Sequence, residues 1–211
     1  MKRLRVRQKG WPGDRQPEER TKVAISSAPA LVVIGIHREE LSFGREVVDG
    51  LRAGEVDVLE IPDGLSGRRP RPDQSFRYDM VHEALYLQLL PHMRSHHQLL
   101  IDLHTGFDEN GPSADLICGD AVLGAHLKTV LARAEPASAR IIVLGAPDAV
   151  RTHTAIPERI WHNPSFLYLC IEIYLPGDGP AQPGAVALAR RLIRLAAGCI
   201  AYRGEAAERA P

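Results

Sequence analysis

Four mainly apolar runs, separated by polar and glycine-containing segments, dominate the hydropathy pattern of this chain. They cover residues 28–36, 99–103, 114–118 and 166–173. Strands of a parallel sheet are covered by helices on both faces, so they read as near-continuous apolar runs. We therefore predict four buried strands. Two less regular apolar segments, at residues 56–61 and 140–144, are expected to add strands beside them.

Between the strands, apolar residues recur three or four positions apart, which is the spacing of one face of an α-helix. This spacing predicts helices at residues 39–51, 78–93, 121–134 and 183–202. Strands that alternate with helices are typical of an α/β fold. We expect a single-domain, three-layer sandwich with a mixed, mostly parallel sheet and helices on both faces.

The expected domain spans residues 26–204 and leaves both ends of the chain outside it. Residues 1–25 are polar and contain Pro12, Gly13 and Pro17, so we expect a flexible N-terminal arm. Residues 205–211 are expected to form a tail. Within the domain, residues 63–77 and 146–164 lack helix or strand patterns. Loops of this length in a compact domain are usually functional or disordered.

Composition narrows the class of protein. Lysine plus arginine equals aspartate plus glutamate, at 26 each in 211 residues, so the chain lacks a net attraction for nucleic acid or anionic membranes. No apolar run reaches the roughly 18–20 residues of a membrane span, and the basic start lacks a signal-peptide segment. Three cysteines without CxxC spacing are typical of buried free thiols. We expect a cytoplasmic protein with no nucleic-acid or membrane partner, and the sequence is compatible with a homo-oligomer.

Candidate chemistry lies where two of the predicted strands end. His37 follows the first strand, and Glu40 lies three positions later on the same face of a helical turn. His104 lies in the segment LLIDLHTG, on the same side of its strand as Asp102. Two imidazoles and a carboxylate that leave a fourth position open are typical of a catalytic zinc site. We predict His37, Glu40 and His104 as zinc ligands, with Asp102 orienting a ligand imidazole.

Glu172 interrupts the last apolar run. A carboxylate in such a run costs several kcal/mol unless it is paired, hydrogen-bonded or protonated. A salt bridge to an arginine is one way to meet that cost, and a position facing the metal site is another. In the second case Glu172 is the general base, which takes a proton from metal-activated water and later gives it to the leaving amine.

A substrate that carries a carboxylate needs a fixed cation, and the fork of an arginine matches a carboxylate. Arg77 and Arg151 are our candidates for substrate binding, because each lies in or beside a long predicted loop. Five further histidines are expected to be exposed: His82, His92 and His126 on helix surfaces, and His96 and His97 in a polar turn. His153 and His162 are expected either at the surface or at the mouth of the pocket beside Glu172.

Three short segments resemble a known family. GIHREE, IDLHTG and CIEIYLPGDG are similar to motifs of the zinc carboxypeptidase superfamily, and most similar to its succinylglutamate desuccinylase and aspartoacylase branch. The resemblance implies one zinc ion, held by His37, Glu40 and His104, and it nominates Glu172 as the catalytic glutamate. The chain differs in having Arg38 where that branch usually has glycine, and the branch's Asn-Arg substrate-binding pair is not evident.

ADLICGD, after the second histidine, also resembles the N-formylglutamate amidohydrolases, which share this general fold. The leading hypothesis is a zinc-dependent hydrolase that cleaves an amide bond of a small N-acyl amino acid or a peptide end, with a small-molecule carboxylate as substrate. The alternatives are an N-formylglutamate amidohydrolase-like enzyme that releases formate, and a non-catalytic relative that binds a metal or a carboxylate.

Overall fold

The computed structural model describes residues 28–66, 75–134, 139–145, 156–177 and 182–208. These residues form a six-stranded sheet with the strand order β2-β1-β3-β6-β4-β5. The strands are β1 (Ala30–Ile34), β2 (Asp57–Glu60), β3 (Leu99–Phe107), β4 (Ser113–Cys118), β5 (Ala139–Val143) and β6 (Leu167–Leu175). Strand β4 pairs antiparallel with β6, and every other pairing is parallel. The prediction of a mixed, mostly parallel sheet is confirmed.

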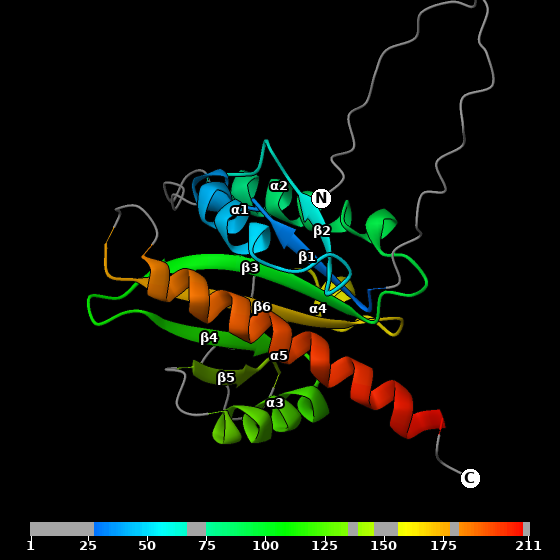
Figure 1. Cartoon of the computed structure of the whole chain (residues 1–211). Helices are drawn as coiled ribbons and strands as arrows, with labels where there is room; N and C mark the ends of the chain where they lie inside the picture. Colours follow the sequence, from blue (N-terminus) through cyan, green and yellow to red (C-terminus); the bar gives the residue numbers. More distant parts are fainter. Residues whose placement is uncertain (1–27, 67–74, 135–138, 146–155, 178–181, 209–211) are drawn as a thin grey trace, which may run out of the picture.

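Helices cover both faces of the sheet, so the predicted three layers are also confirmed (Figure 1). One face packs against α1 (Leu41–Asp49), α3 (Ala121–Arg133) and the long α5 (Pro183–Glu208). The other face packs against α2 (Ser75–Leu87) and the short α4 (Glu158–Trp161). Two separate apolar clusters result, one on each side of the sheet.

Strand β3 shows why a doubly covered strand reads as an apolar run. Leu99, Ile101 and Leu103 join the apolar cluster under α5, whereas Leu100 joins the cluster under α2. Because side chains alternate along a strand, Asp102 and His104 lie on the α2 face with Leu100. The candidate polar residues of β3 are therefore carried into the space between the sheet and α2.

Helix α2 differs from the prediction at both ends. It begins at Ser75, inside the expected loop, and it ends at Leu87 rather than near residue 93. A separate 3-10 turn, Leu90–His92, follows it. Pro91 lies in that turn, and a proline cannot donate the backbone hydrogen bond that a continuing α-helix requires. The remaining part of the expected loop, residues 67–74, lies outside the described residues, as does the predicted N-terminal arm.

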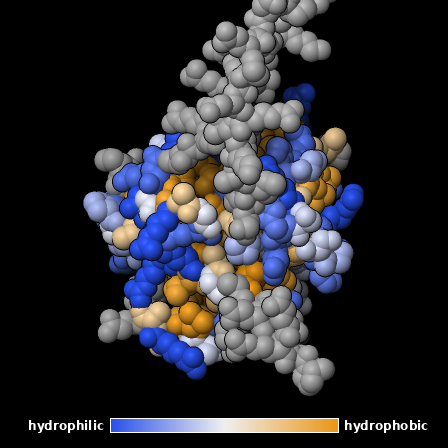
Figure 2. Space-filling view, turned by 45° about the vertical axis from the view of Figure 1, so that its right-hand side comes forward, coloured by the Kyte–Doolittle hydropathy of each residue, from blue (hydrophilic) through white to orange (hydrophobic). Residues whose placement is uncertain are grey.

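Helix α5 is longer than predicted, because it continues through Glu208 into the segment expected as a tail. Among the described residues, no helix combines the length and the apolar character that crossing a membrane requires. On the face shown in Figure 2, hydrophilic and hydrophobic side chains are interspersed. Among the residues whose burial is described, the exposed large apolar side chains are Val58, Met80, Val81, Phe107 and Val122. Singly exposed apolar side chains of this kind are normal on protein surfaces.

Candidate metal centre

His37 is held in place by the chain that follows β2. Strand β1 ends at Ile34, and Gly35 turns the chain with a φ of 84°. The amide of Leu65 then donates to the Ile36 carbonyl at 2.8 Å, and the amide of Arg38 donates to the Leu65 carbonyl at 2.8 Å. These two bonds lie on either side of His37. The backbone of His37 is thus fixed by a segment almost thirty residues further along the chain.

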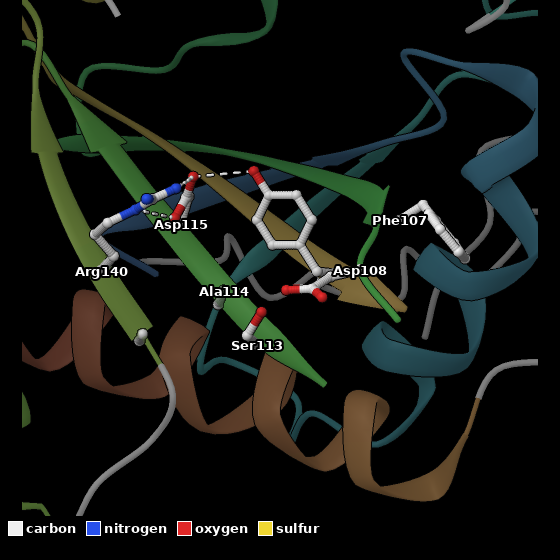
Figure 3. Close-up of a pocket in the computed structure, with 8 residues that line it drawn as sticks. Phe107, Asp108, Ser113, Ala114, Asp115 and Arg140 are labelled. Atoms are coloured by element: carbon white, nitrogen blue, oxygen red, sulfur yellow. Dashed lines mark hydrogen bonds and ion pairs between the residues drawn. The ribbon is translucent and has the colours of Figure 1, made fainter. Parts of the chain in front are cut away.

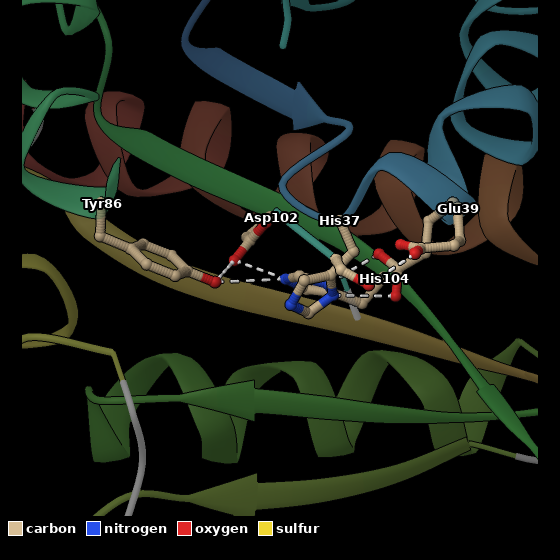
Figure 4. A network of polar contacts seen from close by, with 7 residues as sticks. His37, Glu39, Tyr86, Asp102 and His104 are labelled. Carbon is tan, nitrogen blue, oxygen red and sulfur yellow. Dashed lines mark hydrogen bonds and ion pairs between the residues drawn. The ribbon is translucent and has the colours of Figure 1, made fainter. Parts of the chain in front are cut away.

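Glu40 joins two imidazoles. It ends the 3-10 turn Arg38–Glu40, where its amide donates to the His37 carbonyl at 3.1 Å. One carboxylate oxygen lies 3.1 Å from Nδ1 of His37, and the other lies 2.9 Å from Nδ1 of His104. Each residue offers one possible ligand atom, and these atoms lie within 4.8 Å of one another. Figure 4 shows the side chains of His37 and His104 close together. The structure brings together the three residues predicted as zinc ligands.

His104 is oriented from its far side by Asp102. Its Nε2 lies 2.9 Å from Oδ2 of Asp102 and 3.2 Å from the hydroxyl of Tyr86. The same Asp102 oxygen accepts hydrogen bonds from Tyr86 at 2.5 Å and from Tyr168 at 3.0 Å. With Nε2 directed at Asp102, Nδ1 is the ring nitrogen that faces Glu40. Histidine ligands of metals commonly donate their second ring nitrogen to a carboxylate in this way.

The buried ionisable groups Asp102, His104 and Glu40 form a chain in which a cation lies between two carboxylates. Burial alone would lower the pKa of His104, but the charges and hydrogen bonds of Asp102 and Glu40 raise it well above its usual value. Burial opposes ionisation of Glu40 and Asp102, but their contacts with His104 hold the pKa of each carboxyl below its usual value. Burial, together with the Asp102 charge, raises the pKa of Tyr86 well above its usual value, so its hydroxyl remains a donor.

The donor set fits a zinc ion. Zinc accepts imidazole nitrogens and carboxylate oxygens, and a catalytic site needs three such protein ligands. Nδ1 of His37 faces Glu40, whereas Nε2 of His37 is buried and has no hydrogen-bond partner among the described residues. A histidine with a purely structural role at this depth normally has both ring nitrogens satisfied. Contacts within the described residues therefore leave one ring nitrogen of His37 without a hydrogen-bond partner.

Glu172 lies on the strand next to His104. The two residues are register partners in the parallel pair of β3 and β6, so their side chains point to the same face of the sheet. Glu172 is partly buried, and its Oε2 lies 3.2 Å from the Tyr174 hydroxyl, which also lies 2.9 Å from Oδ2 of Asp115. The predicted base is thus one strand away from the metal-ligand candidates, on their side of the sheet.

Of the two arginines predicted to bind substrate, only Arg77 is among the described residues. Arg77 is exposed in the first turn of α2. Arg151 lies outside the described residues. Among the described residues, no hydrogen bond or ion pair joins Arg77 to His37, Glu40 or His104.

His82 is a residue of this region that the sequence analysis missed. The expectation of an exposed helix position is wrong, because only 5% of His82 is exposed. Its ring centroid lies 5.8 Å from that of His37 and 4.9 Å from that of Tyr86. Tyr78, His82 and Tyr86 are spaced four residues apart, so they share one face of α2. That spacing was the available signal that His82 faces inward.

A second group with metal-ligand chemistry lies at the opposite end of the sheet, where β2 and β3 begin. It consists of Asp57, His96 and His97. His97 was expected to be exposed, which is wrong, because it is 4% exposed. The Arg94 amide donates to Nδ1 of His97 at 3.0 Å, so the proton of the neutral ring lies on Nε2, 2.9 Å from Asp57. A metal would need the lone pair of that nitrogen, so we interpret this group as structural.

Comparison with known proteins supports the fold. No model of a known protein family matches the sequence, and no curated protein matches it significantly. Among solved structures, murine aminoacylase 3 is similar with a TM-score of 0.50 and 15% identity, over 91% of this chain and 67% of that chain. A point mutant of the same protein gives a TM-score of 0.50 at 16% identity, with the same shares of the two chains covered.

The CwlD amidase from Clostridioides difficile, in complex with the GerS lipoprotein, is similar with a TM-score of 0.45 and 7% identity. The match covers 81% of this chain and 97% of that chain. The likeness to aminoacylase 3 shows that the α/β fold described above is shared with a solved protein.

Proposed function

We propose that this protein is a zinc-dependent hydrolase that cleaves an amide bond of a small N-acyl amino acid or a peptide end. The observation that carries the proposal is the convergence of His37, Glu40 and His104 beside Glu172, at the carboxyl edge of the parallel strands. Ligand sites of α/β sheets are usually found at this edge. The resemblance of the three motifs to zinc carboxypeptidases and the fold shared with aminoacylase 3 support the same function.

Each residue of the site has a definite task in this reaction. A zinc ion bound by His37, Glu40 and His104 would polarise the scissile carbonyl and lower the pKa of a water molecule to about 7. Asp102 keeps the His104 ring in the orientation that directs Nδ1 at the site. The Tyr174 hydroxyl contacts Glu172 and helps to hold its carboxylate in place.

Glu172 moves the proton. It takes a proton from the attacking water and delivers it to the nitrogen of the leaving group. The water oxygen joins the carbonyl carbon, the C–N bond breaks, and the products are a carboxylic acid and an amine. One water is consumed, and no further reactant is required. Arg77 and Arg151 remain the proposed contacts for a substrate carboxylate.

The first test is metal content together with turnover of a panel of N-acyl amino acids. We expect about one zinc per chain and loss of activity on chelation, with recovery when zinc is added back. Replacing His37 or His104 by alanine should abolish stoichiometric binding. Sub-stoichiometric metal, combined with activity that chelation does not change, would refute the proposal. Release of formate from N-formyl substrates would instead assign the amidohydrolase alternative.

The second test separates catalysis from metal binding. Glu172→Gln should keep the metal and lower kcat by about 10²–10⁴-fold, which is the usual contribution of a general base. The matched control is Glu46→Gln on α1, which changes an exposed carboxylate and should leave kcat unchanged. If wild type binds zinc and carboxylates but hydrolyses nothing in the panel, the protein is a non-catalytic relative.

A further inference from the structure

The two imidazoles of the candidate metal centre are anchored differently. His104 has a partner at both ring nitrogens, with Nδ1 2.9 Å from Glu40 and Nε2 2.9 Å from Asp102. His37 has Nδ1 3.1 Å from Glu40, but its buried Nε2 has no hydrogen-bond partner among the described residues. A half-turn of the His37 ring about its Cβ–Cγ bond would exchange Nδ1 for a carbon atom, and this torsion is intrinsically broad. Some contact other than a hydrogen bond must therefore hold the ring.

The polar contacts of the sheet beyond His104 lead away from His37. In strand register His104 pairs with Glu172, Glu172 with Asp115, and Asp115 with Arg140, which gives one row across β3, β6, β4 and β5. The row ends at an open hollow of about 570 Å³, where Arg140 donates to Asp115 (Figure 3). Strands β6, β4 and β5 lie two or more strands away from β1, which leads to His37. Support for the His37 ring must come from another side.

Helix α2 provides this support through His82. The His82 ring centroid lies 5.8 Å from that of His37, with an angle of 30° between the ring planes. Aromatic rings are in favourable contact when their centroids are about 4.5–7 Å apart. His82 is itself enclosed along its own helix, since Tyr78 stacks on it at 5.6 Å and Tyr86 lies at 4.9 Å. The His82 ring is thus a fixed surface against which His37 packs.

The same helix contacts both imidazoles that are proposed to bind zinc. Tyr86 reaches His104, because its hydroxyl lies 3.2 Å from Nε2 (Figure 4). His82 contacts Tyr86 and His37, and the His37 and His104 rings lie 4.9 Å apart. These four side chains form a closed chain of contacts. Helix α2 therefore supports one imidazole by a hydrogen bond and the other by ring packing.

The burial of His82 makes this packing restrictive. Only 5% of His82 is exposed, and protein interiors leave few voids into which a ring could move. His37 can rotate only if His82 also moves, and Tyr78 and Tyr86 oppose that movement. His82 is not itself a member of the ligand group, which among the described residues consists of His37, Glu40 and His104. Its influence on a bound metal is therefore exerted through His37.

We propose that His82 is a positioning residue whose ring holds the His37 imidazole with Nδ1 directed at Glu40. This is the orientation in which His37 can serve as a metal ligand. The inference rests on the proposed function, since it assumes that His37 binds zinc. It assigns to His82 the task for His37 that Asp102 performs for His104.

The first experiment measures zinc affinity by competition with a chromophoric chelator. We expect His82→Ala to bind zinc at least about tenfold more weakly than wild type, because loss of a residue that orients a ligand typically costs 10–100-fold. His82→Phe restores a planar ring without the ring nitrogens and should bind zinc with close to wild-type affinity. If His82→Phe loses as much affinity as His82→Ala, His82 acts through a ring nitrogen and the inference fails.

The matched control is His97→Ala. His97 is also a buried histidine, 4% exposed, but it lies at the opposite end of the sheet. Its truncation should lower the stability of the fold and leave zinc affinity unchanged. If His97→Ala weakens zinc binding as much as His82→Ala does, the effect is one of general destabilisation, and the inference is overturned.

Nuclear magnetic resonance of the zinc-free protein gives a readout that needs neither zinc nor turnover. Long-range ¹⁵N–¹H spectra report on both ring nitrogens of each histidine, and His37→Gln identifies the His37 signals. Wild type and His82→Phe should show one sharp set of His37 signals, whereas His82→Ala should show broadened or doubled signals. Broadened or doubled His37 signals in wild type would contradict the inference even if no His82 variant folds.

The inference and the proposed function fail in different ways. If wild type binds no zinc, the proposed function fails, and the spectra still decide whether His82 fixes the His37 ring. If wild type binds one zinc and hydrolyses amides, but His82→Ala keeps the wild-type zinc affinity, the assignment of His82 alone fails.

Discussion

One buried oxygen atom of Asp102 holds three neighbouring side chains in place. Its Oδ2 lies within hydrogen-bond distance of His104, Tyr86 and Tyr168, and the residue has no measurable exposure. A buried carboxylate costs several kcal/mol unless such donors surround it. The two tyrosines therefore stabilise the charge of Asp102, and Asp102 in turn fixes the orientation of His104. Neither tyrosine was singled out from the sequence, because each is separated from Asp102 by 16 or more positions.

This arrangement predicts that Tyr86→Phe weakens metal binding while the fold stays intact. The variant removes the shortest donor to Asp102 and the hydroxyl that contacts Nε2 of His104. Loss of such an outer partner typically costs about 10–100-fold in metal affinity. Competition with a chromophoric zinc chelator measures the change.

Tyr168→Phe is the matched comparison, because Tyr168 donates to Asp102 through a longer bond of 3.0 Å. We expect it to lose less affinity than Tyr86→Phe. Equal zinc affinities in wild type and both variants would show that the tyrosines serve packing alone.

At the scale of elements, the end of β1 and the segment after β2 act together to position His37. Gly35 has a positive φ, and a Cβ at this position would lie 2.5 Å from the Ile61 carbonyl oxygen. Gly64 is packed still more tightly, since a Cβ there would lie 1.9 Å from the Gly35 carbonyl oxygen. The two glycines let the segments approach closely enough to form the backbone bonds on either side of His37.

We predict that Gly35→Ala destabilises the protein by about 2 kcal/mol or more, because left-handed backbone strain alone costs roughly 1–2 kcal/mol and the contact with Ile61 adds to it. Denaturant unfolding monitored by circular dichroism measures the change. Metal affinity should also fall, since His37 lies two residues away.

The control is Gly198→Ala on the exposed side of α5, where an added Cβ meets nothing within 4 Å. Alanine favours a helix over glycine, so this variant should be neutral or stabilising by about 0.5–1 kcal/mol. If both variants unfold at the wild-type denaturant concentration, the close approach at Gly35 has no energetic importance.

At the scale of the whole molecule, helices cover both faces of the sheet, and the resulting burial determines how reactive the cysteine thiols are. Cys118, Cys170 and Cys199 are free thiols that are each buried. Burial raises the pKa of Cys118 to about 11, from an ordinary value of 9.0. Because thiolate is the reactive form, the native protein should resist thiol reagents at pH 8.

We predict that a disulfide reagent labels essentially none of the three thiols in the native protein at pH 8, and all three in guanidinium chloride. The raised pKa also contributes stability that is fully present below pH 9 and is lost as the pH rises toward 11. The unfolded chain gives up the Cys118 proton first in that range. Rapid labelling of the native protein at pH 8 would contradict the burial of these residues.

Local patterns were enough to predict the strands, most helices and the three residues that meet in the candidate metal centre. A strand covered on both faces must be apolar along its length, so the apolar runs that end near His37 and His104 could be identified as buried strands. His37 and Glu40 are neighbours in the chain, and their spacing of three already places them on one face. Helix α2 was predicted less well, because the break at Pro91 was overlooked.

Only the folded chain brings together residues that lie far apart in the sequence. The row of His104, Glu172, Asp115 and Arg140 depends on β6 lying between β3 and β4, and on the antiparallel direction of β4. Strand order and direction are set by how the two helix layers pack on the sheet, which no local spacing encodes. The burial of His82 and His97 likewise follows from packing. The sequence therefore pointed to the proposed metal ligands, whereas the tertiary structure decided which residues surround them.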